Sequence, residues 1–338
     1  MKFTTLLKVD AGDNIFSYKD YYIYVTPTKI SFLDKTTLEE KYKIDDYTDP
    51  DMAEVEGDYL ITLMSQGILF AYDLKEKKKL FTHEFSSSFK PSPFGFTLDK
   101  ERKHIYFIKV NEDEEQAEPN FDEIFSEGDI RIELSGSLYR VSIEDPTHDE
   151  LILKGNFIGI NGASFVDGFI LTDSKHKCQL FNPETKEIND LPFECKECPL
   201  ATDDINKLYF VTRDHGVRVF NEKYQEINLI DLASDTKISY PKEVLESIRK
   251  NVSNNFDSDS IDKEIISYVN PIKPGVLFSV ILSRTGSGTK IVLNDSTTGK
   301  KLGEMNLYYR IKNAYTIDSN HFMFTFGNNS YLMEVDYE

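Results

Sequence analysis

The chain has 338 residues, of which 40% are hydrophobic and 13% aromatic, so it can bury a sizeable core. Its formal net charge of −19 disfavours non-specific binding to nucleic acid or to an anionic membrane. A net charge this negative either only keeps the protein soluble or attracts a basic binding partner. No apolar run reaches the length of a membrane span and the N-terminus has no signal-peptide pattern, so we expect a cytoplasmic protein.

A pair of predicted strands recurs seven times along the chain. The first member is an apolar, aromatic-rich run, at 21–25, 59–63, 104–108, 169–173, 208–212, 276–280 and 322–326. The second member follows a short turn, at 29–34, 67–74, 136–143, 177–182, 216–221, 289–295 and 330–336. An internal repeat of this length predicts a repeat architecture.

Two intervals between repeats are longer than the others because each contains an insertion, at roughly 110–135 and 233–264. Without them both intervals fall to about 36–39 residues, close to the ~40–45 of a four-stranded propeller blade. Many of the strand runs are apolar at consecutive positions. This pattern predicts strands that are covered on both faces.

Several second strands end in Asp or Asn and are followed by a polar turn and a return strand, as after Asp73, Asn182 and Asp295. This segment resembles the quinoprotein-like and WD-repeat-like propellers, although the chain has no Trp and so lacks the Trp-Asp signature. The resemblance implies an all-β, seven-bladed β-propeller. The strand at 2–9 is expected to join the last blade and close the ring, which removes open edges. We therefore predict a single domain over 1–338, with one helical insertion between blades 5 and 6.

The first insertion carries nine acidic residues between positions 112 and 129, interrupted by Phe121, Ile124 and Phe125. It is either a solvated loop or an acidic recognition segment that its two Phe side chains anchor. In the blade model both insertions emerge on the same face. That face is therefore the expected working surface.

The second insertion contains a predicted helix that starts near Pro241, directly after Tyr240. Its apolar residues form one stripe along the helix: Val244, Leu245, Ile248 and Val252. The stripe indicates packing onto the host domain or, less commonly, a lid or a groove-binding helix.

Short loops expected on the same face are basic, in contrast to the chain as a whole. They contribute Lys175, His176 and Lys177, then Arg213 and His215, then Arg284. Such a patch could hold an anionic ligand or an acidic partner segment, or it could be neutralised by the acidic insertion.

Three cysteines are too few for a disulfide scaffold. Cys195 and Cys198 form a Cys-x-x-Cys that the blade model brings near Cys178, and the fourth ligand could be His176, two residues before Cys178, or His215 in a neighbouring loop. Three thiolates and an imidazole could bind a structural zinc ion. The alternative is three reduced cysteines with no metal.

These features favour a non-enzymatic scaffold for protein–protein interaction, which binds a protein or peptide partner and could be an inhibitor or immunity-type protein. The predicted partner-binding residues are Phe121, Phe125, Tyr240, Lys175, His176, Arg213, His215 and Arg284. A propeller hydrolase or lyase with a site in the axial funnel is the alternative, although no catalytic motif supports it. We expect a monomer without a cofactor, apart from the zinc alternative.

Overall fold

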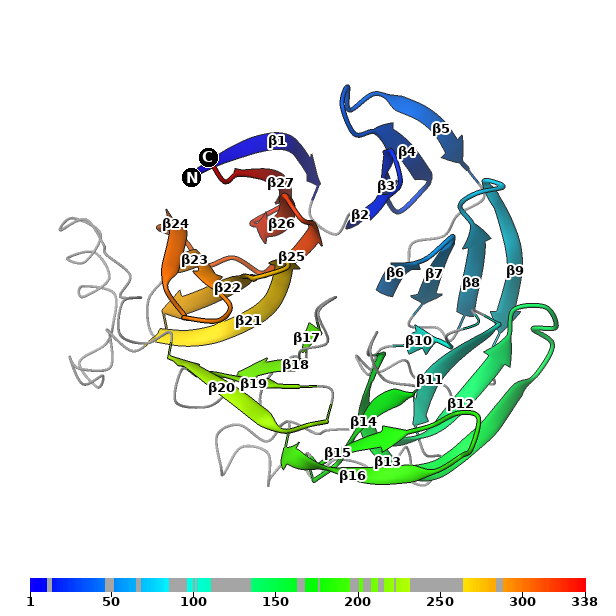
Figure 1. Ribbon diagram of the computed structural model, residues 1–338. Coiled ribbons are helices and arrows are strands. Elements are labelled where there is room, and N and C mark those ends of the chain that lie inside the picture. Colours follow the sequence, from blue (N-terminus) through cyan, green and yellow to red (C-terminus); the bar gives the residue numbers. More distant parts are fainter. Residues whose placement is uncertain are drawn as a thin grey trace, which may run out of the picture. The chain divides into compact units, whose positions relative to one another are not determined.

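The computed structural model describes residues 1–10, 14–45, 52–64, 68–84, 96–99, 101, 103–110, 135–162, 168–175, 177–194, 201–202, 208–211, 216–221, 223–231, 264–283 and 288–338. These residues form 27 strands in six antiparallel sheets (Figure 1). The chain divides into two compact units, Met1–Ile15 with Glu197–Glu338, and Phe16–Lys196. Each unit is considered by itself.

The first unit contains three four-stranded sheets. One has the order β1-β27-β26-β25, and the others run in chain order, β17 to β20 and β21 to β24. The bounds are β1 Lys2–Asp10, β17 Ala201–Thr202, β18 Leu208–Val211, β19 Gly216–Phe220, β20 Glu226–Asp231, β21 Glu264–Lys273, β22 Val276–Ser283, β23 Thr289–Asp295, β24 Lys301–Leu307, β25 Asn313–Asp318, β26 His321–Phe326 and β27 Asn329–Asp336.

The second unit contains two four-stranded sheets, β2 to β5 and β6 to β9, and one seven-stranded sheet, β10 to β16. The first two residues of β2 belong to the N-terminal segment of the first unit. The bounds are β2 Asn14–Tyr18, β3 Tyr21–Val25, β4 Ile30–Asp34, β5 Glu40–Ile44, β6 Met52–Glu56, β7 Tyr59–Met64, β8 Ile68–Asp73, β9 Lys78–Glu84, β10 Phe96–Leu98, β11 His104–Val110, β12 Gly136–Ser142, β13 Asp149–Gly162, β14 Phe169–Asp173, β15 Lys177–Phe181 and β16 Ile188–Glu194.

All seven predicted strand pairs are confirmed as antiparallel hairpins: β3–β4, β7–β8, β11–β12, β14–β15, β18–β19, β22–β23 and β26–β27. The predicted return strands after Asp73, Asn182 and Asp295 are β9, β16 and β24. The expectation that the N-terminal strand joins the last pair is also confirmed, because β1 pairs with β27 from Lys2↔Asp336 to Asp10↔Asn329.

The prediction of a closed seven-bladed propeller with a helical insertion is wrong in this structure. The described strands form six separate sheets, and none of them closes on itself. The third and fourth strand pairs share one sheet because β13 is a single 14-residue strand that pairs with β12 and then with β14. The predicted helix and both insertions lie outside the described residues, and the residues that are described contain no helix.

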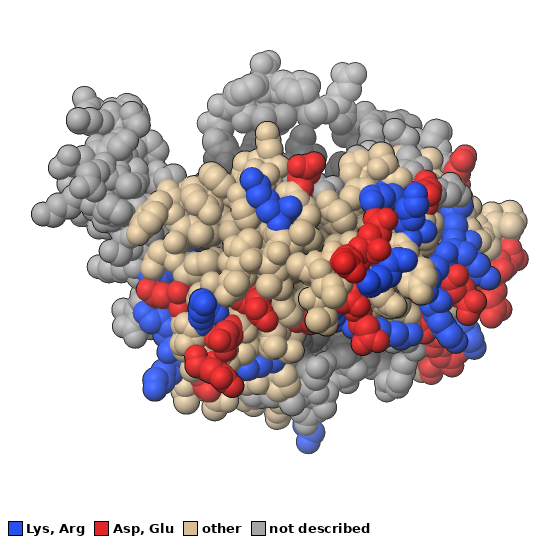
Figure 2. Space-filling view, turned by 90° about the horizontal axis from the view of Figure 1, so that it is seen from above, with Lys and Arg blue, Asp and Glu red and all other residues tan. Residues whose placement is uncertain are grey.

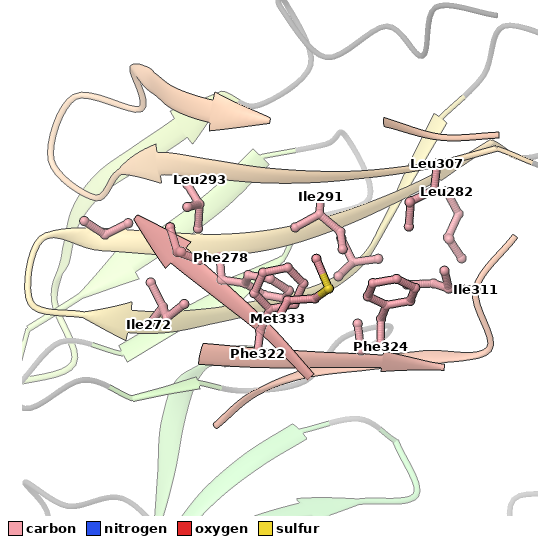
Figure 3. Close-up of a cluster of buried hydrophobic side chains, with 14 residues drawn as sticks. Ile272, Phe278, Leu282, Ile291, Leu293, Leu307, Ile311, Phe322, Phe324 and Met333 are labelled. Atoms are coloured by element: carbon pink, nitrogen blue, oxygen red, sulfur yellow. The ribbon is translucent and has the colours of Figure 1, made fainter. Parts of the chain in front are cut away.

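Consecutive apolar residues are buried on both faces of their strands, as the sequence predicts. In β23 the apolar residues 291–293 are all buried, and in β7 the whole run 60–64 is buried, including Thr62. Figure 3 shows one resulting core, in which Phe278 of β22 meets Phe322 of β26 with ring centroids 4.9 Å apart. Burying a side chain of this size stabilises the fold by roughly 1.5–3 kcal/mol. This core joins two sheets of the first unit.

Candidate interaction edge

The same turn follows the second strand of five hairpins. In the first, the Oδ1 atom of Asp34 accepts hydrogen bonds from the backbone N–H groups of Thr36 and Thr37, both at 2.9 Å. A short side chain that caps its own turn in this way explains why Asp or Asn is found there. The five capping residues are Asp34, Asp73, Asn182, Asn221 and Asp295.

Each of these turns ends in a residue with a left-handed backbone. The residues are Leu38, Lys77, Lys186, Tyr224 and Gly299, with φ between 55° and 72°. In four hairpins this residue is four positions after the cap, but Tyr224 is only three positions after Asn221. The turn between β19 and β20 is therefore one residue shorter than the others.

Four of the hairpins then contain a β-bulge, which leaves one residue of the last strand without a direct partner. The bulged residues are Lys41, Leu80, Ile227 and Leu302. Bulges increase the local twist of a strand and are common at sheet edges. Ile227 and Leu302 are thus equivalent positions in two hairpins of the first unit.

In each hairpin, the residue three positions before the cap pairs with a residue of the return strand. This return-strand residue is polar in four of the five hairpins. These four residues are Lys43, Thr82, Asp190 and Glu304. In β20 the equivalent residue is Leu229, which pairs with Arg218. Leu229 is 58% exposed, the highest value for a large apolar side chain in the described part of the chain, and Ile227 is 50% exposed.

β20 also lacks the Lys or Pro residues that the other strands at this end of their sheets contain. An edge strand presents main-chain donors and acceptors that can pair with another chain, and Lys or Pro commonly prevents this. The strands β1, β5, β9, β16 and β24 each contain Lys or Pro: Lys2 and Lys8, Lys41 and Lys43, Lys78 and Lys79, Pro192, and Lys301. β20, with the sequence EINLID, has neither.

β20 is held firmly from the side of the next sheet. Ile230 is 2% exposed and contributes to an apolar core with residues of β21, β22 and β23. The Nδ2 atom of Asn228 donates a 2.7 Å hydrogen bond to the carbonyl oxygen of Thr297 in the β23–β24 turn. Beside Leu229, Arg218 forms an ion pair with Glu226 at 2.6 Å. β20 therefore combines a fixed backbone with an exposed apolar pair.

Charge by itself does not mark a site on the face drawn in Figure 2, where basic and acidic side chains are interspersed among uncharged ones. Many of the described charges form surface ion pairs, such as Lys29 with Glu40 at 2.6 Å. Exposed pairs of this kind contribute little to stability.

Of the predicted partner-binding residues, the structure describes only Lys175. It is exposed, and its backbone N–H donates a 2.8 Å hydrogen bond to Oδ1 of Asp173. Phe121, Phe125, Tyr240, His176, Arg213, His215 and Arg284 lie outside the described residues. A site on the insertion-bearing face stays a prediction.

Cys178 is buried and disulfide-bonded. A sulfur atom in a disulfide is not a thiolate and cannot act as a zinc ligand in that form. The other predicted ligands, Cys195, Cys198 and either His176 or His215, lie outside the described residues, so the zinc site stays a prediction. Among the residues that are described, no three His, Cys, Asp or Glu side chains are grouped so as to hold a metal ion.

One cluster of ionisable side chains, Lys109, Asp149 and His83, lies inside the second unit. The Nζ atom of Lys109 is 3.4 Å from Oδ2 of Asp149, and Nε2 of His83 is 4.0 Å from Oδ1 of the same carboxylate. All three side chains are largely buried. The carboxylate joins β9 to the start of β13, so the cluster fixes one sheet of this unit against another.

Two further sets of polar residues lie on β21 and β6, which are the first strands of their sheets, whereas β20 is the last strand of its sheet. Asn270 of β21 donates a 2.6 Å hydrogen bond from Nδ2 to Oγ1 of Thr316 in β25, and burial raises the pKa of the neighbouring Tyr268. Neighbouring protein atoms and the charge of Glu56 raise the pKa of Glu54 above its ordinary value, and the exposure of its side chain to solvent limits this shift.

Comparison with known proteins gives no relative from which a role could be transferred. No family model matches the chain, and no curated protein matches its sequence. The resemblance noted from the sequence is supported only as far as an all-β protein with several antiparallel sheets. In the described part of the chain there is no helix long and apolar enough to span a membrane.

Proposed function

We propose that this protein is an interaction module that binds a protein partner through the β20 edge and catalyses no reaction. The observation that carries the proposal is the pair of exposed apolar side chains, Ile227 and Leu229, on an edge strand without Lys or Pro. Exposed apolar surface is common as isolated residues, but two adjacent side chains on an unprotected edge are typical of a contact surface.

The rigidity of the edge supports the same function. A capped turn, a packed Ile230 and the hydrogen bond from Asn228 hold β20 before any partner arrives. A surface that is ordered in advance loses less conformational entropy on binding, so more of the contact energy contributes to affinity.

The proposal is tested by capture from a native extract with the full chain as bait, followed by reconstitution of the complex from purified components. We expect one protein to bind stoichiometrically and to co-migrate with the chain in sedimentation analysis. If no protein is recovered above the level of an unrelated acidic bait of similar charge, the proposal is wrong.

A further inference from the structure

We propose that β20 binds an extended segment of its partner as an added antiparallel or parallel strand, and that this segment alternates apolar residues with Lys or Arg. This inference rests on the proposed interaction function and specifies its partner. Strand addition obtains affinity from main-chain hydrogen bonds and selectivity from alternate side chains.

The main chain of β20 provides the template for this addition. β20 is the last strand of its sheet, and β19 pairs with it along one edge from Gly216↔Asp231 to Phe220↔Glu226. Its six residues extend over roughly 20 Å, which is enough for several ladder hydrogen bonds. In the equivalent hairpin β24 carries Lys301, and the side chain of Met1 lies against Gly303.

The side chains on the exposed surface specify the apolar half of the partner. Leu229 and Ile227 would be covered by apolar residues two positions apart on the added strand, because alternate side chains of a strand share one face. The equivalent surfaces of the other hairpins present Lys43, Thr82, Asp190 or Glu304 to such a strand. Only β20 among these five offers an apolar contact at that position.

Charge specifies the other half of the partner. Glu226 at the start of the strand is ion-paired with Arg218, and the chain as a whole has a net charge of −19. A second copy of the chain carries the same charge and is repelled, whereas a segment with Lys or Arg is attracted. A basic extended segment therefore fits better than self-association through β20.

The test uses a panel of capped decapeptides in which valine, isoleucine or leucine alternates with lysine or arginine. We expect members of the panel to bind the full chain and to slow amide hydrogen exchange within residues 226–231. A second version of each binding peptide, N-methylated at alternate amides on the edge facing the protein, should bind at least about tenfold more weakly because ladder hydrogen bonds are lost.

Two variants of the protein make the test specific. Leu229→Glu should weaken peptide binding by about tenfold or more, because it removes apolar contact area and places a carboxylate against the apolar residues of the added strand. Leu302→Glu, at the bulge of β24, is the matched control and should bind as the wild type does. Thermal melting of both variants establishes that they are folded.

Three results would overturn the inference: no peptide of the panel binds, binding is insensitive to N-methylation and to Leu229→Glu, or β20 instead pairs with β20 of a second copy. A protein captured from extract could also bind wild type and Leu229→Glu equally. That result would overturn strand addition and the β20 site, but the chain would still have an interaction function at another surface. Failure to capture any protein removes the proposed function itself.

Discussion

The β19–β20 and β23–β24 hairpins belong to the same unit and share one design, yet they present different surfaces. Both have a capped turn, a left-handed residue and a bulge, at Ile227 in one and Leu302 in the other. They differ two residues further on, where Leu229 is 58% exposed and Glu304 is ion-paired with Lys301 at 2.8 Å. The capped turn and the bulge set the backbone conformation in both hairpins. The outward side chain, Leu229 or Glu304, then determines what the edge can bind.

Turn chemistry and surface chemistry are thus separable in this repeat. Changes at the turn should alter stability with little effect on binding, and changes at Leu229 should do the opposite. The predictions below test this separation, from the largest expected effect to the smallest.

Gly299→Ala should lower the free energy of unfolding by about 2–4 kcal/mol. Gly299 has φ +72°, and an added Cβ would lie 2.8 Å from Cγ2 of the buried Ile230, so backbone strain and overpacking combine. Gly275→Ala is the control, because Gly275 has φ +80° with nothing within 4 Å of an added Cβ. Urea denaturation should show a loss of only about 1 kcal/mol there. Equal losses at both positions would contradict the contact between this turn and β20.

Asp295→Ala should cost about 1–2 kcal/mol. Its Oδ1 atom accepts hydrogen bonds from the backbone N–H groups of Thr297 and Thr298, at 3.0 and 2.7 Å, and from the Thr298 hydroxyl at 2.8 Å. Asn221→Ala in the other hairpin removes two backbone bonds to a neutral oxygen and should cost less. Thermal unfolding of both variants compares the two caps, and a larger loss for Asn221→Ala would contradict this ranking.

Lys186→Gly should raise stability by about 0.5–1 kcal/mol. Lys186 is exposed and has φ 60°, at the position that Gly299 occupies in the β23–β24 turn, so glycine relieves backbone strain without loss of packing. Lys175→Gly, in an exposed turn whose lysine does not have a positive φ, should give no such gain. A destabilised Lys186→Gly would show that this strain is not significant.

Acid should weaken the Asp-capped turns more than the Asn-capped ones. Hydrogen bonds from the N–H groups of Thr37 and Thr36 lower the pKa of Asp34. A lowered carboxyl pKa gives stability that is present above the unfolded value, near 3.8, and is lost as pH falls through the folded value. Asp34→Asn should therefore lose less stability than wild type between pH 5 and pH 2. Identical acid profiles would contradict the role of the charge.

Leu229→Glu should change the free energy of unfolding by less than about 0.5 kcal/mol, because the side chain is exposed and its backbone pairing with Arg218 is unaffected. Denaturation curves of this variant and Leu302→Glu should nearly superimpose. A large loss at Leu229 alone would indicate that it supports the fold and is not a surface for a partner.

The sequence was sufficient to predict the strand pairs and the pairing of the first strand with the last. Apolar residues at consecutive positions, as at 60–64, indicate two covered faces, and a cap such as Asp73 marks the start of the return strand. The merger of two repeats was not predicted, because β13 continues through 14 residues that contain no Pro to end it. The pairing of distant strands into sheets depends on packing that local patterns do not encode.

The candidate edge was missed for a related reason. In the sequence, Ile227, Leu229 and Ile230 look like one apolar strand, and only the shorter turn after Asn221 shows which of them face solvent. Lys43, Thr82 and Glu304 lie nine positions after their caps but Leu229 lies only eight after Asn221, so an alignment on the caps alone would have placed the buried Ile230 there instead. The partner-binding residues chosen from the sequence were drawn from long insertions and basic loops, and all but Lys175 lie outside the described residues.

The most direct test of the β20 edge is the dissociation constant of the purified partner for three forms of the chain: wild type, Leu229→Glu and Leu302→Glu. The account predicts an increase of about tenfold or more for Leu229→Glu and an unchanged value for Leu302→Glu. Equal dissociation constants for all three forms, with the folds intact, would contradict it.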